Sequence, residues 1–360
     1  IKRRTDMKKF LISTLCALLV IGSAGCSLAA DKADGYLALG DSITTGFEPG
    51  GSHLTDDSFA GIIASKYGKT YDNAAVGGST SADLLKLVQS GEADDKIKNA
   101  GLVTITSGGN DMLYVLYAKI TDEYNALYKT QKTADELMAI LGGDDVFAKV
   151  PVAAVAESVL ASLPQDEDAK NAVKEYAQNI RKTAEYIKGI NPTATIAVAS
   201  QYNPFESLSA SQISFYRSLC ECVEVYVKLM REELLSASDG AFRVADVYSA
   251  FSGKPGLCNA NEQSLDVHPT REGHALIAQT FAEVLKPEIT IKADGENTAV
   301  RIFAPLFSDG ARVIGIKYLS DGKLGSLHYY SADADRTVTG EPGTQFYMYG
   351  ADGAMLAKNS

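Results

Sequence analysis

The chain has 360 residues, of which 46% are hydrophobic and 22% are charged, and its formal net charge is −11. This composition is typical of a folded globular protein, and the length allows a large core and more than one domain. The acidic balance offers no basic surface for nucleic acid or anionic lipid headgroups, so it excludes nucleic-acid partners and electrostatic membrane binding.

The first residues differ in composition from the rest. Lys8 and Lys9 precede an apolar run at 10–21, and small residues at 22–25 lead to Cys26. This pattern predicts an exported protein with a signal peptide over residues 1–25 and translation starting at Met7. The apolar run is too short for a permanent membrane span, which needs about 20 residues.

The segment Ser23-Ala24-Gly25-Cys26 resembles the bacterial lipobox, in which the cysteine becomes the first mature residue and carries lipid. The resemblance implies a lipoprotein held on the outer face of a bacterial cell membrane through Cys26, with residues 26–34 as a linker. Secretion with cleavage nearby is the alternative.

Between residues 35 and 286, apolar runs alternate with amphipathic stretches. The predicted strands are Tyr36–Leu39, Thr70–Ala75, Leu102–Thr106, Ala194–Ala199 and Phe242–Val247. The predicted helices are Phe59–Tyr67, Ser81–Val88, Ala169–Lys188, Ala210–Ser236 and Glu272–Leu285. Such alternation predicts a parallel sheet covered on both faces, a three-layer α/β/α sandwich of flavodoxin-like type.

Residues 112–168 form an additional segment of helical composition, interrupted by Gly142-Gly143 and Pro151. Two interpretations stay open. The segment could shape the substrate pocket or act as a lid. Alternatively, its tyrosines at helical spacing could simply pack extra helices onto the sheet.

The pattern changes in residues 287–360. Short strands are predicted at Thr298–Phe303, Ala311–Tyr318, Gly325–Tyr330, Thr344–Tyr349 and Ala354–Ala357. The turns expected between strands are Asp309-Gly310, Asp321-Gly322 and Asp352-Gly353. We predict a small β-sandwich accessory module that serves as a spacer, with weak carbohydrate binding as the alternative.

Four motifs succeed one another along the chain, and the first three follow predicted strands. They are Gly40-Asp41-Ser42, residues 73–80, Gly108-Gly109-Asn110-Asp111 and residues 266–278. Their order resembles that of the SGNH hydrolases, also called GDSL esterases and lipases, over residues 36–285. Because ligands bind beyond the carboxyl ends of strands in open α/β sheets, these motifs are expected to converge.

The resemblance implies an oxyanion hole made of the backbone N–H groups of Ser42 and Gly78 and the side-chain amide of Asn110. Glycine permits close backbone approach, and asparagine supplies a neutral N–H donor. Gly77 could exchange roles with Gly78, and an ordinary turn glycine is the other interpretation.

Ser42 is the predicted nucleophile, and a serine hydroxyl needs a neighbouring base to take its proton. The chain has four histidines, His53, His268, His274 and His328. His268 is the predicted base because His268-Pro269-Thr270 matches the last motif of the family. His274 is expected to pack on the following helix.

Asp266 is the first choice for the acid that orients His268. In the commonest family pattern the acid lies three residues before the histidine, but Leu265 occupies that position here. A dyad oriented by a backbone carbonyl and help from Asp246 remain alternatives. Asp41 and Asp111 are expected to cap helices or brace the site.

Cys220, Cys222 and Cys258 lie outside the N-terminal segment, and their spacing lacks a zinc-site pattern. Buried thiols and one bridge from Cys258 are both open. No Gly-x-Ser-x-Gly elbow or Walker loop occurs, so we predict neither an α/β-hydrolase nor a nucleotide site. The expected chemistry needs no cofactor and no metal.

We therefore predict a serine hydrolase that cleaves carboxylic esters through an acyl-enzyme on Ser42, with a lysophospholipid or another acyl lipid as substrate. An O-acetylated polysaccharide is the alternative substrate. A surface-binding lipoprotein without turnover is the rival from a different class.

Overall fold

The computed structural model describes residues 35–142, 146–294, 297–306, 311–331, 336–340 and 342–359. The predicted signal peptide, the start at Met7, the linker at 26–34 and the lipidated Cys26 all lie outside these residues, as does the Asp309-Gly310 turn.

A five-stranded parallel sheet forms the centre of the molecule, with strand order β2-β1-β3-β4-β5. Its strands are β1 (Gly35–Gly40), β2 (Tyr71–Asn73), β3 (Ala100–Thr106), β4 (Thr195–Ala199) and β5 (Arg243–Ala245). This is the flavodoxin-like order, in which the chain reverses its direction of winding beside β1 and β3. A ligand site is therefore expected at the carboxyl ends of these two strands.

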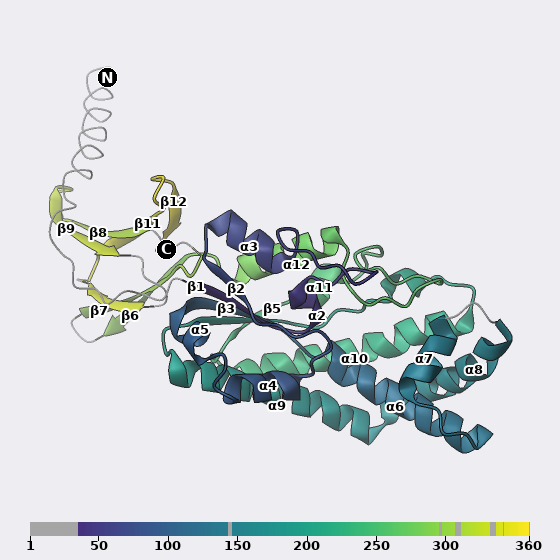
Figure 1. Cartoon of the computed structure of the whole chain (residues 1–360). Coiled ribbons are helices and arrows are strands. Elements are labelled where there is room, and N and C mark those ends of the chain that lie inside the picture. Colours follow the sequence, from purple (N-terminus) through teal and green to yellow (C-terminus); the bar gives the residue numbers. More distant parts are fainter. Residues whose placement is uncertain are drawn as a thin grey trace. The chain divides into compact units, whose positions relative to one another are not determined.

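Helices cover both faces of this sheet (Figure 1). One face carries α3 (Phe59–Tyr67), α11 (Val247–Phe251) and α12 (Arg271–Val284). The other carries α4 (Ser81–Gln89), α5 (Asp94–Asn99), α9 (Glu167–Ile190) and α10 (Ser214–Ser238). Tyr36 and Ala38 of β1 belong to the first core, whereas Leu37 and Leu39 belong to the second. This alternation is that of a strand buried on both faces, and the predicted three-layer sandwich is confirmed.

The segment after β3 is helical, with α6 (Gly109–Tyr128), α7 (Ala134–Gly142), α8 (Val146–Ser162) and the 3-10 turn η1 (Leu163–Gln165). Within the described residues, Phe147–Gln165 is long and apolar enough to span a membrane by composition. Val152, Ala156 and Leu160 of this stretch are nevertheless buried in the core beside α10. One side of α8 therefore packs into the core, whereas Phe147 and Val150 near its start are exposed.

Two of the element boundaries that differ from prediction have a clear local cause. The strand expected to reach Val247 ends at Ala245, because Asp246 caps α11 by accepting a hydrogen bond from the Ser249 N–H. The helix expected from Ala210 begins at Ser214, because the Ser211 hydroxyl accepts from the Ile213 N–H and holds a turn there.

Two antiparallel sheets follow α12. One contains β6 (Glu288–Asp294), β7 (Asn297–Phe303) and β10 (Arg336–Gly340). The other contains β8 (Arg312–Tyr318), β9 (Leu324–Ser331), β11 (Gln345–Tyr349) and β12 (Met355–Lys358). Val300, Val313 and Phe346 bring both sheets into one apolar cluster. The predicted antiparallel strands are confirmed, and β6 and β10 are additional to them.

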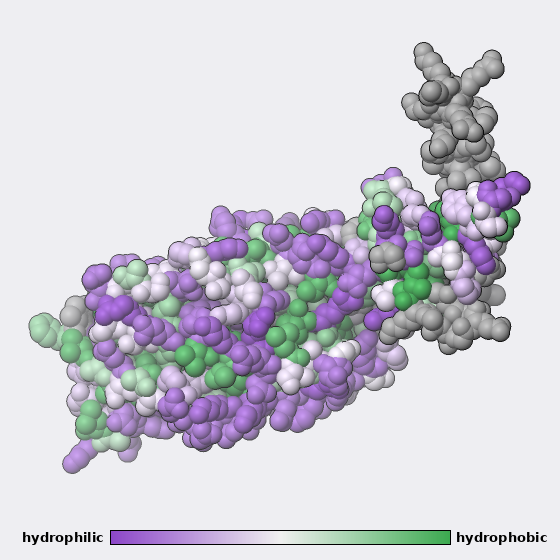
Figure 2. All heavy atoms as spheres, turned by 180° about the vertical axis from the view of Figure 1, so that it is seen from behind, coloured by the Kyte–Doolittle hydropathy of each residue, from purple (hydrophilic) through white to green (hydrophobic). Residues whose placement is uncertain are grey.

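Two side chains that follow the α/β sandwich in the sequence are buried in its core. Phe303 and Leu306 are buried in the same cluster as Phe281 of α12. The guanidinium of Arg243 lies 3.6 Å from the centre of the Phe303 ring. Elsewhere, hydrophilic side chains cover most of the face that Figure 2 shows, with apolar side chains in patches between them.

Candidate active site

Ser42 is the first residue of α2 (Ser42–Thr45), the single helical turn that follows β1. The turn into it needs Gly40, whose φ is +138°, because a Cβ there would lie 2.0 Å from the Thr106 carbonyl oxygen. Asp41 then caps α2 by accepting from the Ile43 N–H at 3.1 Å. Together these contacts position Ser42 at the carboxyl end of β1.

Asp41 is buried and also accepts a hydrogen bond from the Thr106 hydroxyl at 2.8 Å. Burial raises the pKa of Asp41, and the Thr106 hydrogen bond opposes this rise. The capping role predicted for Asp41 is thus confirmed, and it ties the Ser42 turn to the end of β3.

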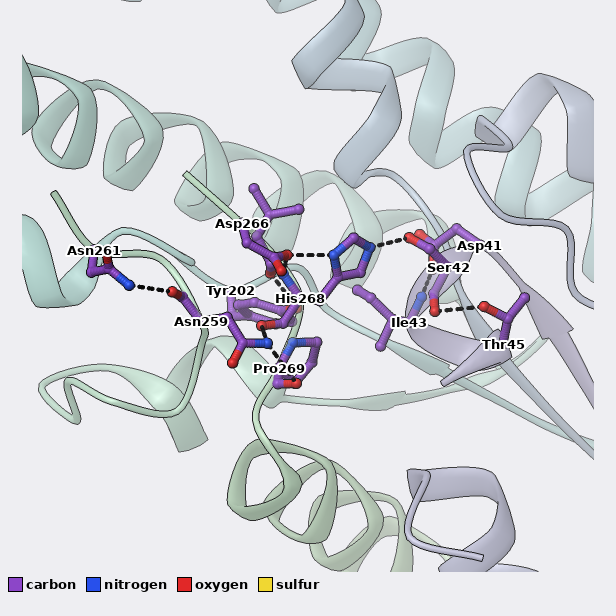
Figure 3. A network of polar contacts seen from close by, with 11 residues as sticks. Asp41, Ser42, Ile43, Thr45, Tyr202, Asn259, Asn261, Asp266, His268 and Pro269 are labelled. Atoms are coloured by element: carbon purple, nitrogen blue, oxygen red, sulfur yellow. Dashed lines mark hydrogen bonds and ion pairs between the residues drawn. The ribbon is translucent and has the colours of Figure 1, made fainter. Parts of the chain in front are cut away.

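Ser42, His268 and Asp266 form a continuous hydrogen-bonded chain (Figure 3). Ser42 Oγ and His268 Nε2 are 2.8 Å apart. His268 Nδ1 and Asp266 Oδ1 are 2.5 Å apart. The structure therefore brings these three predicted residues together, although they come from opposite ends of the α/β sandwich sequence.

The spacing between Asp266 and His268 is short, but the geometry accommodates it. Asp266 Oδ1 also accepts the backbone N–H of His268 at 3.0 Å, which folds the carboxylate back toward the ring. Burial alone would raise the pKa of Asp266, but the hydrogen bonds from His268 outweigh it and hold that pKa below its ordinary value. Asp266 is thus ionised at neutral pH.

Asp246, the alternative acid, has a different set of partners. Both of its carboxylate oxygens accept from Arg231, at 2.8 and 2.7 Å. The same carboxylate also caps α11. No contact with His268 occurs in the described part of the chain, so Asp246 has a structural position rather than a place beside the base.

Three residues that sequence reasoning missed hold the His268 loop. Asn259 donates to the His268 carbonyl from its backbone N–H at 3.0 Å and from Nδ2 at 3.1 Å. The Tyr202 hydroxyl donates to the Val267 carbonyl at 3.2 Å. The Phe47 ring packs 4.5 Å from the imidazole, centre to centre. No motif marks these contacts in the sequence.

The predicted oxyanion donors lie around a loop that approaches Ser42. Gly78 has a φ of +79°, and a Cβ on Gly77 would lie 4.0 Å from the Ser42 Cβ. Asn110 lies on the first turn of α6 and donates from Nδ2 to the Ser79 carbonyl at 2.9 Å. Among the described residues, the N–H groups of Ser42 and Gly78 have no hydrogen-bond acceptor.

Asp111 braces this loop from α6, as predicted. Its carboxylate accepts from the Ser81 N–H at 2.9 Å and from the Ser81 hydroxyl at 2.5 Å. Burial raises the pKa of Asp111, and these hydrogen bonds oppose the rise. The start of α4 is therefore tied to the start of α6.

The other histidines lie apart from Ser42. His274 is buried on α12, as predicted, where Nδ1 accepts from the Phe59 N–H at 3.3 Å. Burial lowers the pKa of His274 to about 4, so its ring is neutral at pH 7. His53 is exposed and contacts Phe47, and His328 belongs to β9.

An apolar pocket of about 80 Å³ opens beside Ser42 and Asn110. Its walls come from α6, from the chain after β4 and from the middle of α10. They include Met112, Leu113, Leu116, Tyr202, Pro204, Phe205, Val223, Tyr226, Val227 and Met230. This pocket suits the hydrocarbon part of a substrate.

The three described cysteines are free thiols. Cys220 and Cys222 are buried on α10, and burial raises the pKa of each to about 11. The buried-thiol interpretation therefore holds for Cys220 and Cys222, whereas Cys258 is half-buried. Cys222 contributes to the pocket wall.

Several known proteins are similar to this chain. A protein of Bacillus subtilis (strain 168) described as uncharacterized protein YpmR is 25% identical over 285 residues, covering 77% of this chain and 93% of that protein. The crystal structure of phospholipase A1 from Streptomyces albidoflavus NA297 is similar with a TM-score of 0.44 and 15% identity, over 69% of this chain and 98% of that one. An extracellular lipase from Streptomyces rimosus is similar with a TM-score of 0.42 and 18% identity, over 69% and 98%.

The sequence model of the family described as GDSL-like Lipase/Acylhydrolase matches residues 36–281. This range includes every residue of the hydrogen-bonded chain and of the predicted oxyanion hole. The protein therefore belongs to the GDSL-like lipase/acylhydrolase family of hydrolases.

Proposed function

We propose that this protein is a serine esterase that cleaves carboxylic esters of acyl lipids through an acyl-enzyme on Ser42. The observation that carries the proposal is the hydrogen-bonded chain from Ser42 Oγ through His268 to Asp266 at the mouth of an apolar pocket. A hydroxyl within 2.8 Å of an imidazole nitrogen is the arrangement that nucleophilic catalysis requires.

In the first half of the reaction, Ser42 Oγ attacks the ester carbonyl while His268 Nε2 takes its proton. Asp266 holds the other ring nitrogen and stabilises the imidazolium that forms. His268 then gives the proton to the departing alcohol as the carbon–oxygen bond breaks. In the second half, water attacks the acyl-serine by the same route and releases the acid.

The negative charge on the tetrahedral intermediate needs donors that are already in place. The N–H groups of Ser42 and Gly78 have no acceptor within the described chain, and Asn110 uses one amide hydrogen on Ser79 and keeps the other. Each such donor is worth roughly 3 to 4 kcal/mol of barrier.

A lysophospholipid or similar acyl lipid is favoured as substrate by the apolar wall of the pocket beside Ser42. An acetyl group fills little of such a wall, so the O-acetylated polysaccharide is the second candidate. We also propose export, with a lipid on Cys26 holding the protein to the outer face of the membrane. The support is the residue pattern before Cys26. Mass spectrometry of protein extracted from native membranes tests this point, and an unmodified N-terminus other than Cys26 would contradict it.

Residues 287–360 are proposed to act as a small accessory module, a spacer rather than part of the reaction. Support comes from the apolar cluster shared by its two sheets. The catalytic residues all precede it in the chain.

Hydrolysis of p-nitrophenyl esters of increasing acyl length tests the activity, with Ser42→Ala as the control. We expect activity in the wild type that the variant loses. A fluorophosphonate probe should label the wild type but not Ser42→Ala. Failure of both assays would favour the binding-protein alternative.

A further inference from the structure

A second apolar cavity, of about 130 Å³, adjoins the pocket beside Ser42. We call the pocket beside Ser42 the inner chamber and this cavity the outer chamber. The two chambers share three wall residues, Leu113, Leu116 and Phe205. Leu116 and Phe205 are buried, so they form an internal partition between the chambers rather than a surface.

The chambers follow one another along α6. The inner chamber uses residues from Gly109 to Leu116, and the outer chamber uses residues from Leu113 to Ile120. Ile120 lies ten residues after Asn110, which at 1.5 Å per residue is about 15 Å along the helix. The outer chamber therefore continues the inner one in the direction away from Ser42.

The wall chemistry of the outer chamber suits hydrocarbon. Ile120, Met138 and Leu141 supply apolar side chains, and no Lys or Arg lines either chamber in the described chain. Its acidic residue, Glu262, is already engaged, because its carboxylate accepts from the Ser211 hydroxyl at 2.5 Å. An anionic headgroup would therefore find no cationic side chain in the lining, whereas methylene groups would be removed from water.

We propose that a long acyl chain occupies both chambers, passing the Leu116–Phe205 partition, and that the outer chamber selects long acyl chains over short ones. This inference rests on the proposed esterase function and specifies its substrate class. The helices after β3 then act as a specificity element, with Met138 of α7 and Ile120 of α6 as its length-determining residues.

Each methylene group that is buried in the transition state raises kcat/KM by about fourfold. Several methylene groups in the outer chamber would thus favour a myristoyl ester over a butyryl ester by more than about a hundredfold. A chain stopped at the partition would gain nothing from further carbons.

The test compares kcat/KM for p-nitrophenyl myristate and butyrate in variants that fill the outer chamber. Met138→Trp and Ile120→Phe each add bulk to walls that belong to the outer chamber alone. Ala139→Trp is the matched control, because Ala139 is exposed on the same helix as Met138. We expect the myristate-to-butyrate ratio to fall at least tenfold in the first two variants and to stay at the wild-type value in the control.

Binding of myristate to the Ser42→Ala variant, followed by calorimetry, separates this inference from the proposed function. Suppose that the wild type hydrolyses no ester but that adding Met138→Trp to Ser42→Ala weakens myristate binding. The outer chamber then binds acyl chains, and the esterase proposal fails. The inference is overturned if the wild type and the three variants hydrolyse esters with the same myristate-to-butyrate ratio. It is also overturned if the wild type prefers butyrate.

Discussion

Asn110 donates a hydrogen bond from Nδ2 to the Ser79 carbonyl at 2.9 Å, which fixes the first turn of α6 against the loop that carries Gly78. The carboxylate of the adjacent Asp111 accepts hydrogen bonds from Ser81, the first residue of α4, which follows that loop. One helix start therefore aligns the side-chain donor and the loop that holds the backbone donor.

Removing the Asn110 amide should reduce turnover strongly. Asn110→Ala deletes one oxyanion donor, so we expect kcat to fall by about 10² to 10³. Steady-state kinetics with a p-nitrophenyl ester measures this, and thermal unfolding checks that the variant is still folded. A loss smaller than about threefold would remove Asn110 from the oxyanion hole.

Asp266 and Asp246 give a matched pair of aspartates. Asp266→Asn should lower kcat by about 10⁴, because an amide cannot hold the required imidazole tautomer or stabilise the imidazolium. Asp246→Asn should leave kcat near the wild-type value and lower the free energy of unfolding instead, since it weakens the pair with Arg231. Equal kinetic losses in both variants would contradict the assignment of the acid.

His274 should make stability depend on pH. Its pKa is about 4 in the folded protein against an ordinary 6.5, so the unfolded chain binds more protons between these values. Its contribution is therefore fully present above pH 6.5 and is lost as pH falls toward 4, by about 3 kcal/mol in all.

Urea unfolding of the wild type and of His274→Gln at pH 7 and pH 5 measures this effect. The wild type should lose more unfolding free energy than the variant between these two pH values, because glutamine does not titrate. Parallel losses in the two proteins would show that His274 is not the responsible group.

Gly40 should tolerate no side chain. Gly40→Ala places a Cβ against the Thr106 carbonyl oxygen and should cost about 3 kcal/mol or more, with loss of activity as the Ser42 turn shifts. Gly50→Ala is the control, since Gly50 also has a positive φ, +92°, but has open space around it. Its cost should stay near 1 to 2 kcal/mol. Chemical denaturation compares the two, and equal costs would exclude the steric explanation.

The sequence predicted the buried parts of the fold best. Strands β1, β3 and β4 are continuous apolar runs, and their observed bounds lie within two residues of the predicted ones. Strand β6 was not predicted although its polar and apolar residues alternate as in a half-buried strand. Strand β10 gives a weak signal, because Val338 is the one apolar side chain among its five residues.

The residues of the site likewise divide into those that the sequence predicted and those that it did not. Ser42, Asn110 and His268 lie in motifs that the sequence displays, and their positions after strands follow from topology. Asn259 and Tyr202 could not be predicted, because they act through contacts with main-chain carbonyls that depend on the folded arrangement of loops. The outer chamber likewise depends on how four helices and two loops meet.

The i, i+2 spacing of Asp266 and His268 has a consequence for how accurately this fold must be built. When acid and base sit on separate elements, two independent distances must both be correct. Here a single short turn sets the acid–base distance, because one carboxylate oxygen takes both the backbone N–H and the ring nitrogen of His268. The tertiary structure then has one alignment left to achieve, that of Ser42 with the imidazole. Small shifts between distant parts of the fold would therefore disturb one hydrogen bond of the three catalytic residues, the one between Ser42 and His268.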